Sequence, residues 1–140
     1  RCVRPMRAVE ASNLWTYTTA AYRQANVSAA NQLNFVIGVS EDAVCARVSA
    51  QSENSTDNIN SVVGIGLDST TAASSQTSNF NQVGVAARSA PVGAWYHGFP
   101  GVGLHYLAWL EYSVATGLTS WYGDGGTTYI QSGIMGEIIG

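Results

Sequence analysis

Short runs rich in Val, Ile, Thr, Tyr and Trp recur along this chain, and Gly, Ser, Asn and Asp separate them at short intervals. No long stretch carries apolar residues at the i, i+3, i+4, i+7 spacing of an amphipathic helix. This pattern is typical of an all-β fold, and we predict an antiparallel β-sandwich. The predicted strands occupy residues 14–23, 32–40, 43–51, 61–67, 81–87, 94–97, 103–112, 118–122 and 129–139.

Two polar connections refine this prediction. Residues 39–42 (VSED) form a tight link between two strong strands, so we expect those strands to pair as a hairpin. Residues 68–79 (DSTTAASSQTSN) are long for a hairpin loop. They indicate either a crossing from one sheet to the other or an exposed distal loop.

The first 13 residues differ in character from the rest. They are rich in Arg and contain Pro5, and we predict a connecting or anchor segment that leaves residues 14–140 as one folded domain. The chain begins with Arg1 rather than Met. We therefore expect a processed product or the terminal piece of a longer polypeptide.

The predicted strand 103–112 is apolar on both faces. Alternation places His105, Leu107, Trp109 and Glu111 on one face, and Tyr106, Ala108, Leu110 and Tyr112 on the other. An isolated antiparallel sandwich needs only one covered face for each sheet. Because no helix is predicted to supply a second cover, we expect another copy of the chain there, and we assign His105, Leu107, Trp109 and Glu111 to a subunit interface.

Composition narrows the function classes. The 140 residues suit a single domain with a substantial core. Only 11% of them are charged, against about 25% in ordinary domains, so the surface must be mostly neutral and polar. All six basic residues are Arg and three lie in the first seven positions, so no basic stripe exists and nucleic acid is excluded as a partner. The net charge of -3 and the lack of a long apolar run argue against membrane insertion.

Glu111 and Asp124 are the two carboxylates that could form a glycosidase pair. Asp124 stands in YGDGG, where Asp commonly forms a turn and the glycines supply positive φ. Glu111 stands among apolar neighbours and needs a partner such as Arg, a Tyr hydroxyl or a backbone amide. Structural roles are favoured over catalysis for both residues.

Other catalytic, cofactor and metal motifs are missing from the sequence. His97 and His105 accompany no nucleophile motif, and no His, Cys or carboxylate group has metal-ligand spacing. Gly64 and Gly66 lack the third glycine of a dinucleotide loop, and we expect them to make room for bulky rings. We predict no catalytic residue, no metal and no cofactor.

The two cysteines, Cys2 and Cys45, match no metal or redox spacing. A disulfide between them is the less favoured alternative. We expect Cys2 to be a terminal thiol and Cys45 to behave as a small buried side chain.

Aromatic residues near predicted loops are the best candidates for ligand binding. Aromatic rings can stack on the apolar faces of sugars while polar side chains bond the hydroxyl groups. The alternative, in which these rings close the ends of the sandwich core, is the simpler expectation. The candidate residues are Trp95, Tyr96, His97, Trp121, Tyr122 and Asp124.

Three segments carry a family resemblance: YRQAN at 22–26, GLHYLAWLEYS at 103–113 and WYGDGGTTYIQSGIMGEIIG at 121–140. With most of the chain from Leu14 onward, they resemble the carboxy-terminal domains of bacteriophage and prophage fibres, head spikes and collagen-like structural proteins. The resemblance implies a compact jelly roll, similar in shape to the trimeric heads of the tumour-necrosis-factor and complement families. It also implies a homotrimer joined to other virion proteins through the N-terminal segment.

These expectations combine into one main hypothesis and two alternatives. The main hypothesis is a non-enzymatic protein of the virion surface, a capsid spike or tail fibre head that attaches to the host envelope through surface polysaccharide. Three weak sites on one rigid trimer would bind a repetitive surface with high avidity. The first alternative is a purely structural cap or decoration of the virion, and the second is a small polysaccharide depolymerase that uses Glu111 and Asp124.

Overall fold

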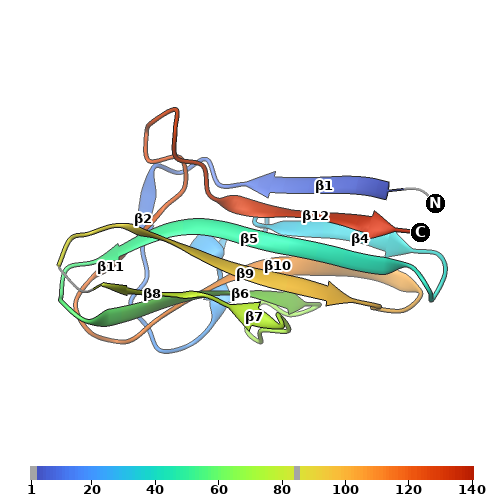
Figure 1. Cartoon of the computed structure of the whole chain (residues 1–140), viewed down its shortest axis with the longest axis horizontal. Helices are drawn as coiled ribbons and strands as arrows, with labels where there is room; N and C mark the ends of the chain where they lie inside the picture. Colours follow the sequence, from blue (N-terminus) through green and yellow to red (C-terminus); the bar gives the residue numbers. More distant parts are fainter. Residues whose placement is uncertain (1–2, 84–85) are drawn as a thin grey trace.

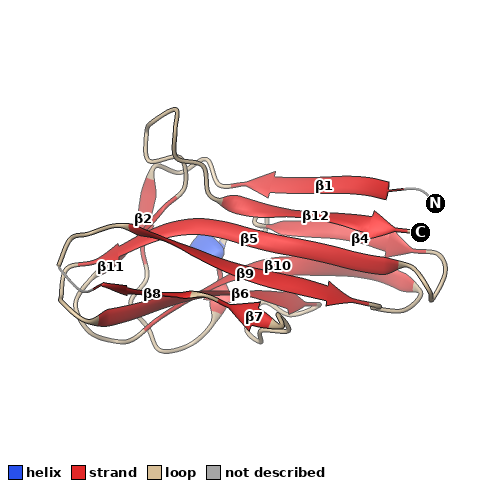
Figure 2. Ribbon diagram, viewed as in Figure 1, coloured by secondary structure: helices blue, strands red, loops and turns tan. Residues whose placement is uncertain are grey.

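The computed structural model describes residues 3–83 and 86–140 and forms two β-sheets packed face to face (Figure 1). Every strand pairing within these residues is antiparallel. The only helical element in them is a single 3-10 turn, η1 (Ala25–Val27) (Figure 2). The predicted all-β antiparallel sandwich is therefore confirmed. No helix in this part of the chain is long and apolar enough to cross a membrane.

The described strands divide between a seven-stranded and a five-stranded sheet. The seven-stranded sheet contains β1 (Val3–Val9), β2 (Leu14–Thr16), β5 (Ala43–Asn54), β7 (Thr77–Ser78), β9 (Ala90–Gly98), β11 (Thr119–Tyr122) and β12 (Gly133–Ile139). The five-stranded sheet contains β3 (Arg23–Gln24), β4 (Gln32–Ile37), β6 (Ile59–Leu67), β8 (Phe80–Val83) and β10 (Gly103–Ser113).

The core lies between the two sheets and is built by strict alternation of side chains. Each long strand directs every second residue inward, which is the period that β-structure imposes. Apolar side chains at these inward positions are almost completely shielded from solvent. They include Leu33, Phe35 and Ile37 of β4, Val44, Ala46 and Val48 of β5, and Leu107 and Trp109 of β10.

The hairpin predicted around residues 39–42 is wrong. β4 pairs with β10 in the five-stranded sheet, whereas β5 belongs to the seven-stranded sheet. The link still makes a tight turn, in which the Asp42 amide donates to the Val39 carbonyl at 3.1 Å. It carries the chain across the core, so that the apolar faces of β4 and β5 contribute to the core from opposite sheets.

Residues 14–23 do not form one strand as predicted. β2 lies in the seven-stranded sheet and β3 in the five-stranded sheet, so the residues between them cross from one sheet to the other. The segment 68–79 crosses in the opposite direction, from β6 to β7, which confirms one of the two expectations for it. Part of the predicted strand 81–87 lies outside the described residues.

The middle of the second face of β10, at Ala108 and Leu110, is covered by the chain itself, which corrects the inference that a partner copy must cover it there; Leu104 on the same face is exposed. Leu110 is completely buried. The loop after β6 folds back over this face, and amides of Ser74 and Ser75 donate to the Ile65 carbonyl at 2.7 and 3.0 Å. Gly66 allows this close approach, because a Cβ there would collide with the backbone carbonyl of Ser69.

Gly64 performs a related role on the same face. A Cβ at Gly64 would lie 3.2 Å from the Tyr22 ring. Tyr22 in turn packs on Tyr112, with the ring centroids 5.3 Å apart. The expectation that these glycines make room for bulky groups holds for Gly64, although the ring that fills the space belongs to Tyr22 and a loop backbone fills the space at Gly66.

The N-terminal segment is part of the sandwich, so the boundary predicted between residues 13 and 14 is wrong. β1 pairs with β12 over seven residues, from Val3 opposite Ile139 to Val9 opposite Gly133. Figure 1 shows β1 as an edge strand beside β12, with both chain ends at the same end of the molecule. Pro5 is tolerated because β1 has no further neighbour on its open edge among the described strands.

Glu10 fastens the end of β1 to the body of the molecule. Its carboxylate accepts hydrogen bonds from the Asn31 side-chain amide at 2.6 Å and from the Ser12 backbone amide at 2.9 Å. Burial raises the pKa of Glu10, but the hydrogen bonds from Ser12, Asn31 and Asn26 outweigh it and hold the pKa below its ordinary value of 4.5. The ionised carboxylate is therefore the form that the folded state prefers.

A Glu10→Gln variant should consequently lose the pH dependence that Glu10 contributes. A carboxyl with a lowered pKa stabilises the fold above its unfolded-state value, and this contribution disappears as the pH falls through the folded-state pKa. The difference in the free energy of unfolding between wild type and Glu10→Gln should shrink as the pH is lowered from neutral to below 4.5. Urea titrations across this pH range, with exposed Glu41→Gln as control, measure it; a difference that grows on acidification contradicts the assignment.

Candidate ligand-binding site

Two rows of side chains cross the outer face of the seven-stranded sheet. β9, β5, β12 and β1 lie next to one another there, and their pairing registers align residues from four distant parts of the sequence. The first row reads Trp95, Arg47, Met135 and Arg7. The second row reads His97, Cys45, Glu137 and Pro5. We call these two rows the sheet-face site.

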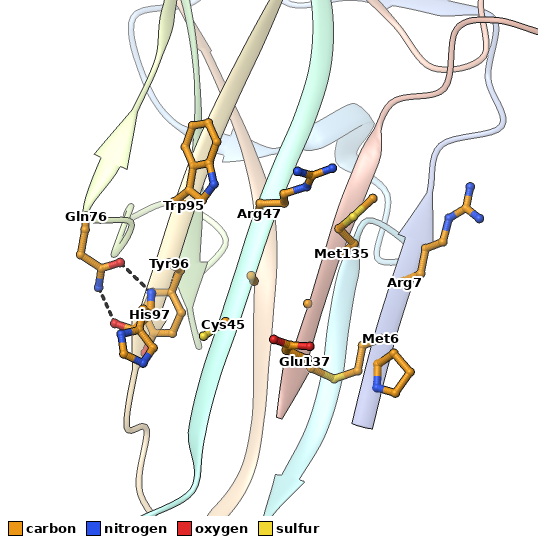
Figure 3. Close-up of a pocket in the computed structure, with 13 residues that line it drawn as sticks. Met6, Arg7, Cys45, Arg47, Gln76, Trp95, Tyr96, His97, Met135 and Glu137 are labelled. Atoms are coloured by element: carbon orange, nitrogen blue, oxygen red, sulfur yellow. Dashed lines mark hydrogen bonds between the residues drawn. The ribbon is translucent and has the colours of Figure 1, made fainter. Parts of the chain in front are cut away.

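The sheet-face site is hollowed. A groove of about 630 Å³ runs over it and is lined by all eight side chains and by Gln76 (Figure 3). A smaller hollow of about 250 Å³ lies on the other side of Trp95, over Gly93 and Ser49. Arg47 and Trp95 line both hollows, so they stand at the junction of the two.

The open edge of the groove is fixed by a reciprocal pair of hydrogen bonds. The Gln76 side chain donates to the His97 carbonyl and accepts from the His97 amide, both at 2.7 Å (Figure 3). The backbone amide of Gln76 also donates to the Trp95 carbonyl at 3.0 Å. The backbone beneath Trp95 and His97 is therefore held on both sides, by β5 and by the segment that leads into β7.

The electrostatics of the groove are dominated by Arg7 and Arg47. Within the described part of the chain, neither guanidinium forms an ion pair, and the carboxylate that shares the groove is Glu137. Burial and the neighbouring charge of Glu137 raise the pKa of the Cys45 thiol. Cys45 therefore stays protonated near neutral pH and is a poor nucleophile. It forms no disulfide in the described residues, and Cys2 lies outside them.

Three of the predicted ligand-binding residues, Trp95, Tyr96 and His97, lie in β9. Trp95 is 46% exposed and His97 is also exposed, and both face the groove. Tyr96 points the opposite way into the core, because neighbouring residues of a strand face opposite sides. The assignment of the Tyr96 ring to ligand binding is therefore wrong.

Trp121 and Tyr122, which are neighbours in β11, also face opposite sides of the sheet. Trp121 is completely buried in the core, where its indole N–H donates to the Tyr17 carbonyl at 3.2 Å, so it cannot stack on a ligand. Tyr122 lies half-buried on the outer face. Burial, with the hydrogen bond and charge of Glu53, raises the pKa of Tyr122 to about 12. It stands roughly 13 Å from Trp95 along the strand direction, four residues of β5 away.

Asp124 has the structural role that the sequence indicated. Its carboxylate accepts from the Gly126 amide at 2.8 Å, and its carbonyl accepts from the Thr127 amide at 3.1 Å. Gly125 and Gly126 have φ of 61° and 64°, as this turn requires. Asp124 lines neither of the two hollows and is not part of the sheet-face site.

Three of the four residues assigned to a subunit interface lie inside one chain. Leu107, Trp109 and Glu111 are fully buried between the two sheets, so their assignment to an interface is wrong. His105 is partly buried, and its Nδ1 lies 2.8 Å from Asp68. Burial raises the pKa of Asp68, but the hydrogen bonds from His105 and the Tyr106 backbone amide outweigh burial and hold the pKa below its ordinary value. The pair ties the loop after β6 to β10.

Glu111 is the centre of a buried polar cluster. Its two oxygens accept from the Trp15 indole at 2.6 Å, from Arg23 Nε at 2.7 Å and from the Asn26 amide at 3.2 Å. Burial raises the pKa of Glu111, and the contacts with Trp15, Arg23 and Asn26 oppose this. The cluster joins β2, β3 and η1 to β10 and lines neither hollow.

Sequence reasoning missed most of the sheet-face site. Arg47, Met135 and Glu137 have no local motif around them, and Arg7 was placed in a connecting segment. Each becomes a neighbour of Trp95 or His97 only through strand pairing. The alternation of β9 does predict that Trp95 and His97 share one face, and that was the available signal.

Comparisons with known proteins add little to this geometry. No protein family and no curated protein matches the chain. A family two carbohydrate esterase from Cellvibrio japonicus shows a structural likeness with 11% sequence identity and a TM-score of 0.30. The likeness covers 99% of this chain and 35% of that protein, so this chain spans about a third of its length. A TM-score this low does not establish a shared fold. Among the described residues, no cluster of three or more His, Cys, Asp or Glu side chains could hold a metal ion.

Proposed function

We propose that this chain is the jelly-roll head of a fibre or spike on the surface of a phage or phage-like virion, and that it attaches to polysaccharide of the bacterial envelope. The observation that carries the binding role is the exposed indole of Trp95 beside Arg47, at the junction of two hollows on one sheet face. Sugar recognition commonly uses an aromatic ring for the apolar face of a pyranose and polar groups for its hydroxyls.

The groove supplies both kinds of contact. Trp95 and Met135 offer apolar surface, and Gln76, Glu137 and Arg47 offer hydrogen-bonding groups around it. The row from Trp95 to Arg7 crosses three strand spacings, or about 14 Å, which is long enough for several sugar rings. An open groove of this kind accepts an internal stretch of a polymer and does not require a chain end.

Binding without catalysis is part of the proposal. A depolymerase that used Glu111 and Asp124 would need both carboxylates at the bound sugar. Glu111 is enclosed by its three donors, and Asp124 is occupied in its turn. Neither carboxylate lines the groove.

Retention of the protein on host cells and on their purified surface polysaccharide tests the proposal. We expect binding to both, and no increase in reducing ends after prolonged incubation with the polysaccharide. Failure to bind either one contradicts an attachment role and leaves a structural cap as the better account. Release of reducing ends contradicts the non-enzymatic part.

We also propose that the head is a homotrimer, whose subunits meet at exposed apolar side chains of β4 and β10. Val36 and Leu104 lie directly opposite each other on β4 and β10, and they are 60% and 76% exposed. Val102 and Phe99 are exposed in the adjoining loop. Exposed apolar side chains that gather at one place commonly mark a protein contact.

A charge at Leu104 should therefore dissociate the trimer. Light scattering coupled to size-exclusion chromatography should give three times the chain mass for wild type and the chain mass for Leu104→Asp. Thr70→Asp, which places the same charge on an exposed loop residue, is the control and should stay trimeric. A monomeric wild type contradicts the proposed assembly.

A further inference from the structure

We propose that the sheet-face site is specific for acidic polysaccharide, with Arg47 and Arg7 each binding one carboxylate of the same polymer chain. This inference rests on the proposed glycan-binding function and names the chemical class of the ligand. It starts from the position of the two guanidinium groups in one cross-strand row, on the same face as the exposed ring of Trp95.

The register fixes the order of contacts along the groove. Arg47 lies one strand from Trp95, and Arg7 lies two strands beyond Arg47. With neighbouring strands about 4.8 Å apart, the two Arg positions are separated by roughly 10 Å. A polymer that lies across the strands would stack one ring on Trp95, present a carboxylate to Arg47 and present the next carboxylate to Arg7, about two sugar rings further on.

Both Arg side chains are available to bind an external anion. Neither forms an ion pair or a side-chain hydrogen bond within residues 3–83 and 86–140, although the chain as a whole carries more acidic than basic residues. Arg23, by contrast, is paired with Glu111. Guanidinium groups bind carboxylates with two parallel hydrogen bonds, which gives orientation as well as attraction.

Glu137 sets a limit on where the anions can lie. It occupies the second row, beside Met135 of the first row, one strand from Arg47 and one from Arg7. A carboxylate directly over Glu137 would be repelled. The sugar between the two charged contacts should therefore be neutral, and its hydroxyls can donate to Glu137. Acidic sugars that alternate with neutral ones fit this pattern of charges.

The test uses a panel of uronic-acid-containing bacterial capsular polysaccharides, each printed beside its carboxyl-reduced form. Carboxyl reduction removes the charge and keeps the sugar backbone. We expect wild type to bind at least one acidic polymer about tenfold or more tightly than its reduced form, and to bind it more weakly as salt rises.

Variants locate the effect. Arg47→Gln and Arg7→Gln should each weaken binding of the acidic polymer about five- to tenfold and weaken binding of the reduced polymer by a smaller factor, so that the preference for the acidic form falls. Arg88→Gln removes an exposed Arg outside the groove and should bind as wild type does. Glu137→Gln should tighten binding of the acidic polymer, which a purely structural role of Glu137 would not produce.

The results distinguish a failure of the charge specificity from a failure of glycan attachment itself. Equal binding of acidic and reduced polymers overturns the charge specificity but leaves glycan attachment in place. Loss of acidic binding in Arg88→Gln to the same extent as in Arg47→Gln also overturns it, because attraction would then depend on net charge. Binding of no polysaccharide in either form overturns both the inference and the proposed function.

Discussion

Replacing Glu111 with leucine is expected to lower the free energy of unfolding by about 3–5 kcal/mol, because removing one partner of a buried ion pair leaves the other partners uncompensated. The variant leaves the Trp15 indole and the Asn26 amide without their acceptor and Arg23 without its counter-charge. Urea denaturation followed by tryptophan fluorescence measures the change, since Trp15 itself lies in the cluster and packs edge-on against Trp109.

Two further variants make the assignment specific. Glu111→Gln keeps the side-chain shape but turns an amide N–H₂ toward N–H donors, so it should be destabilised by about 1–3 kcal/mol. Glu41→Leu removes an exposed carboxylate and should change the free energy of unfolding by less than about 0.5 kcal/mol. A Glu111→Leu protein as stable as wild type would contradict the role of the buried cluster.

The Trp95→Ala variant is expected to lose about 2 kcal/mol of polysaccharide binding, or roughly thirtyfold in affinity, because truncating a central aromatic contact commonly costs this much. Its free energy of unfolding should change little, since the ring is 46% exposed and lies outside the core cluster. Titration of wild type and variant against the bound polysaccharide, together with urea denaturation, separates these two quantities.

Exposed aromatic residues elsewhere provide the control for Trp95. Tyr129 is 84% exposed and lines neither hollow, so Tyr129→Ala should bind as wild type does. Trp95→Phe keeps a ring at the site and should restore part of the affinity. Wild-type binding by Trp95→Ala would place the ligand away from the sheet-face site.

The sequence predicts the strands better than it predicts their partners. Alternation predicts two apolar faces on residues 103–112: Leu107 and Trp109 are buried on one, and on the other Ala108 and Leu110 are buried whereas Leu104 is exposed. The link at residues 39–42 was misassigned because a tight turn can serve a hairpin or a crossing between sheets equally well. The second cover of β10 was misassigned because a loop of small polar residues gives no apolar signal, yet it covers the strand with its backbone.

Local sequence also identifies only part of the candidate site, because strand pairing is not specified locally. Glu111 was expected to need an Arg or a backbone amide, and Arg23 and the Asn26 amide supply them. Trp95 was identified from its place near a loop. Arg47 and Arg7 were not, because they lie 48 and 88 residues before Trp95 and reach it only through pairing registers that the local sequence does not specify.

The most direct test of the sheet-face site is a titration of the ¹⁵N-labelled protein with the bound polysaccharide, observed through the four tryptophan indole N–H signals. Trp15, Trp109 and Trp121 are buried, whereas Trp95 is exposed in the groove. We predict that the Trp95 indole signal shifts progressively with added ligand and that the other three stay in place. A Trp95 signal that does not move while the protein binds polysaccharide would contradict the location of the site.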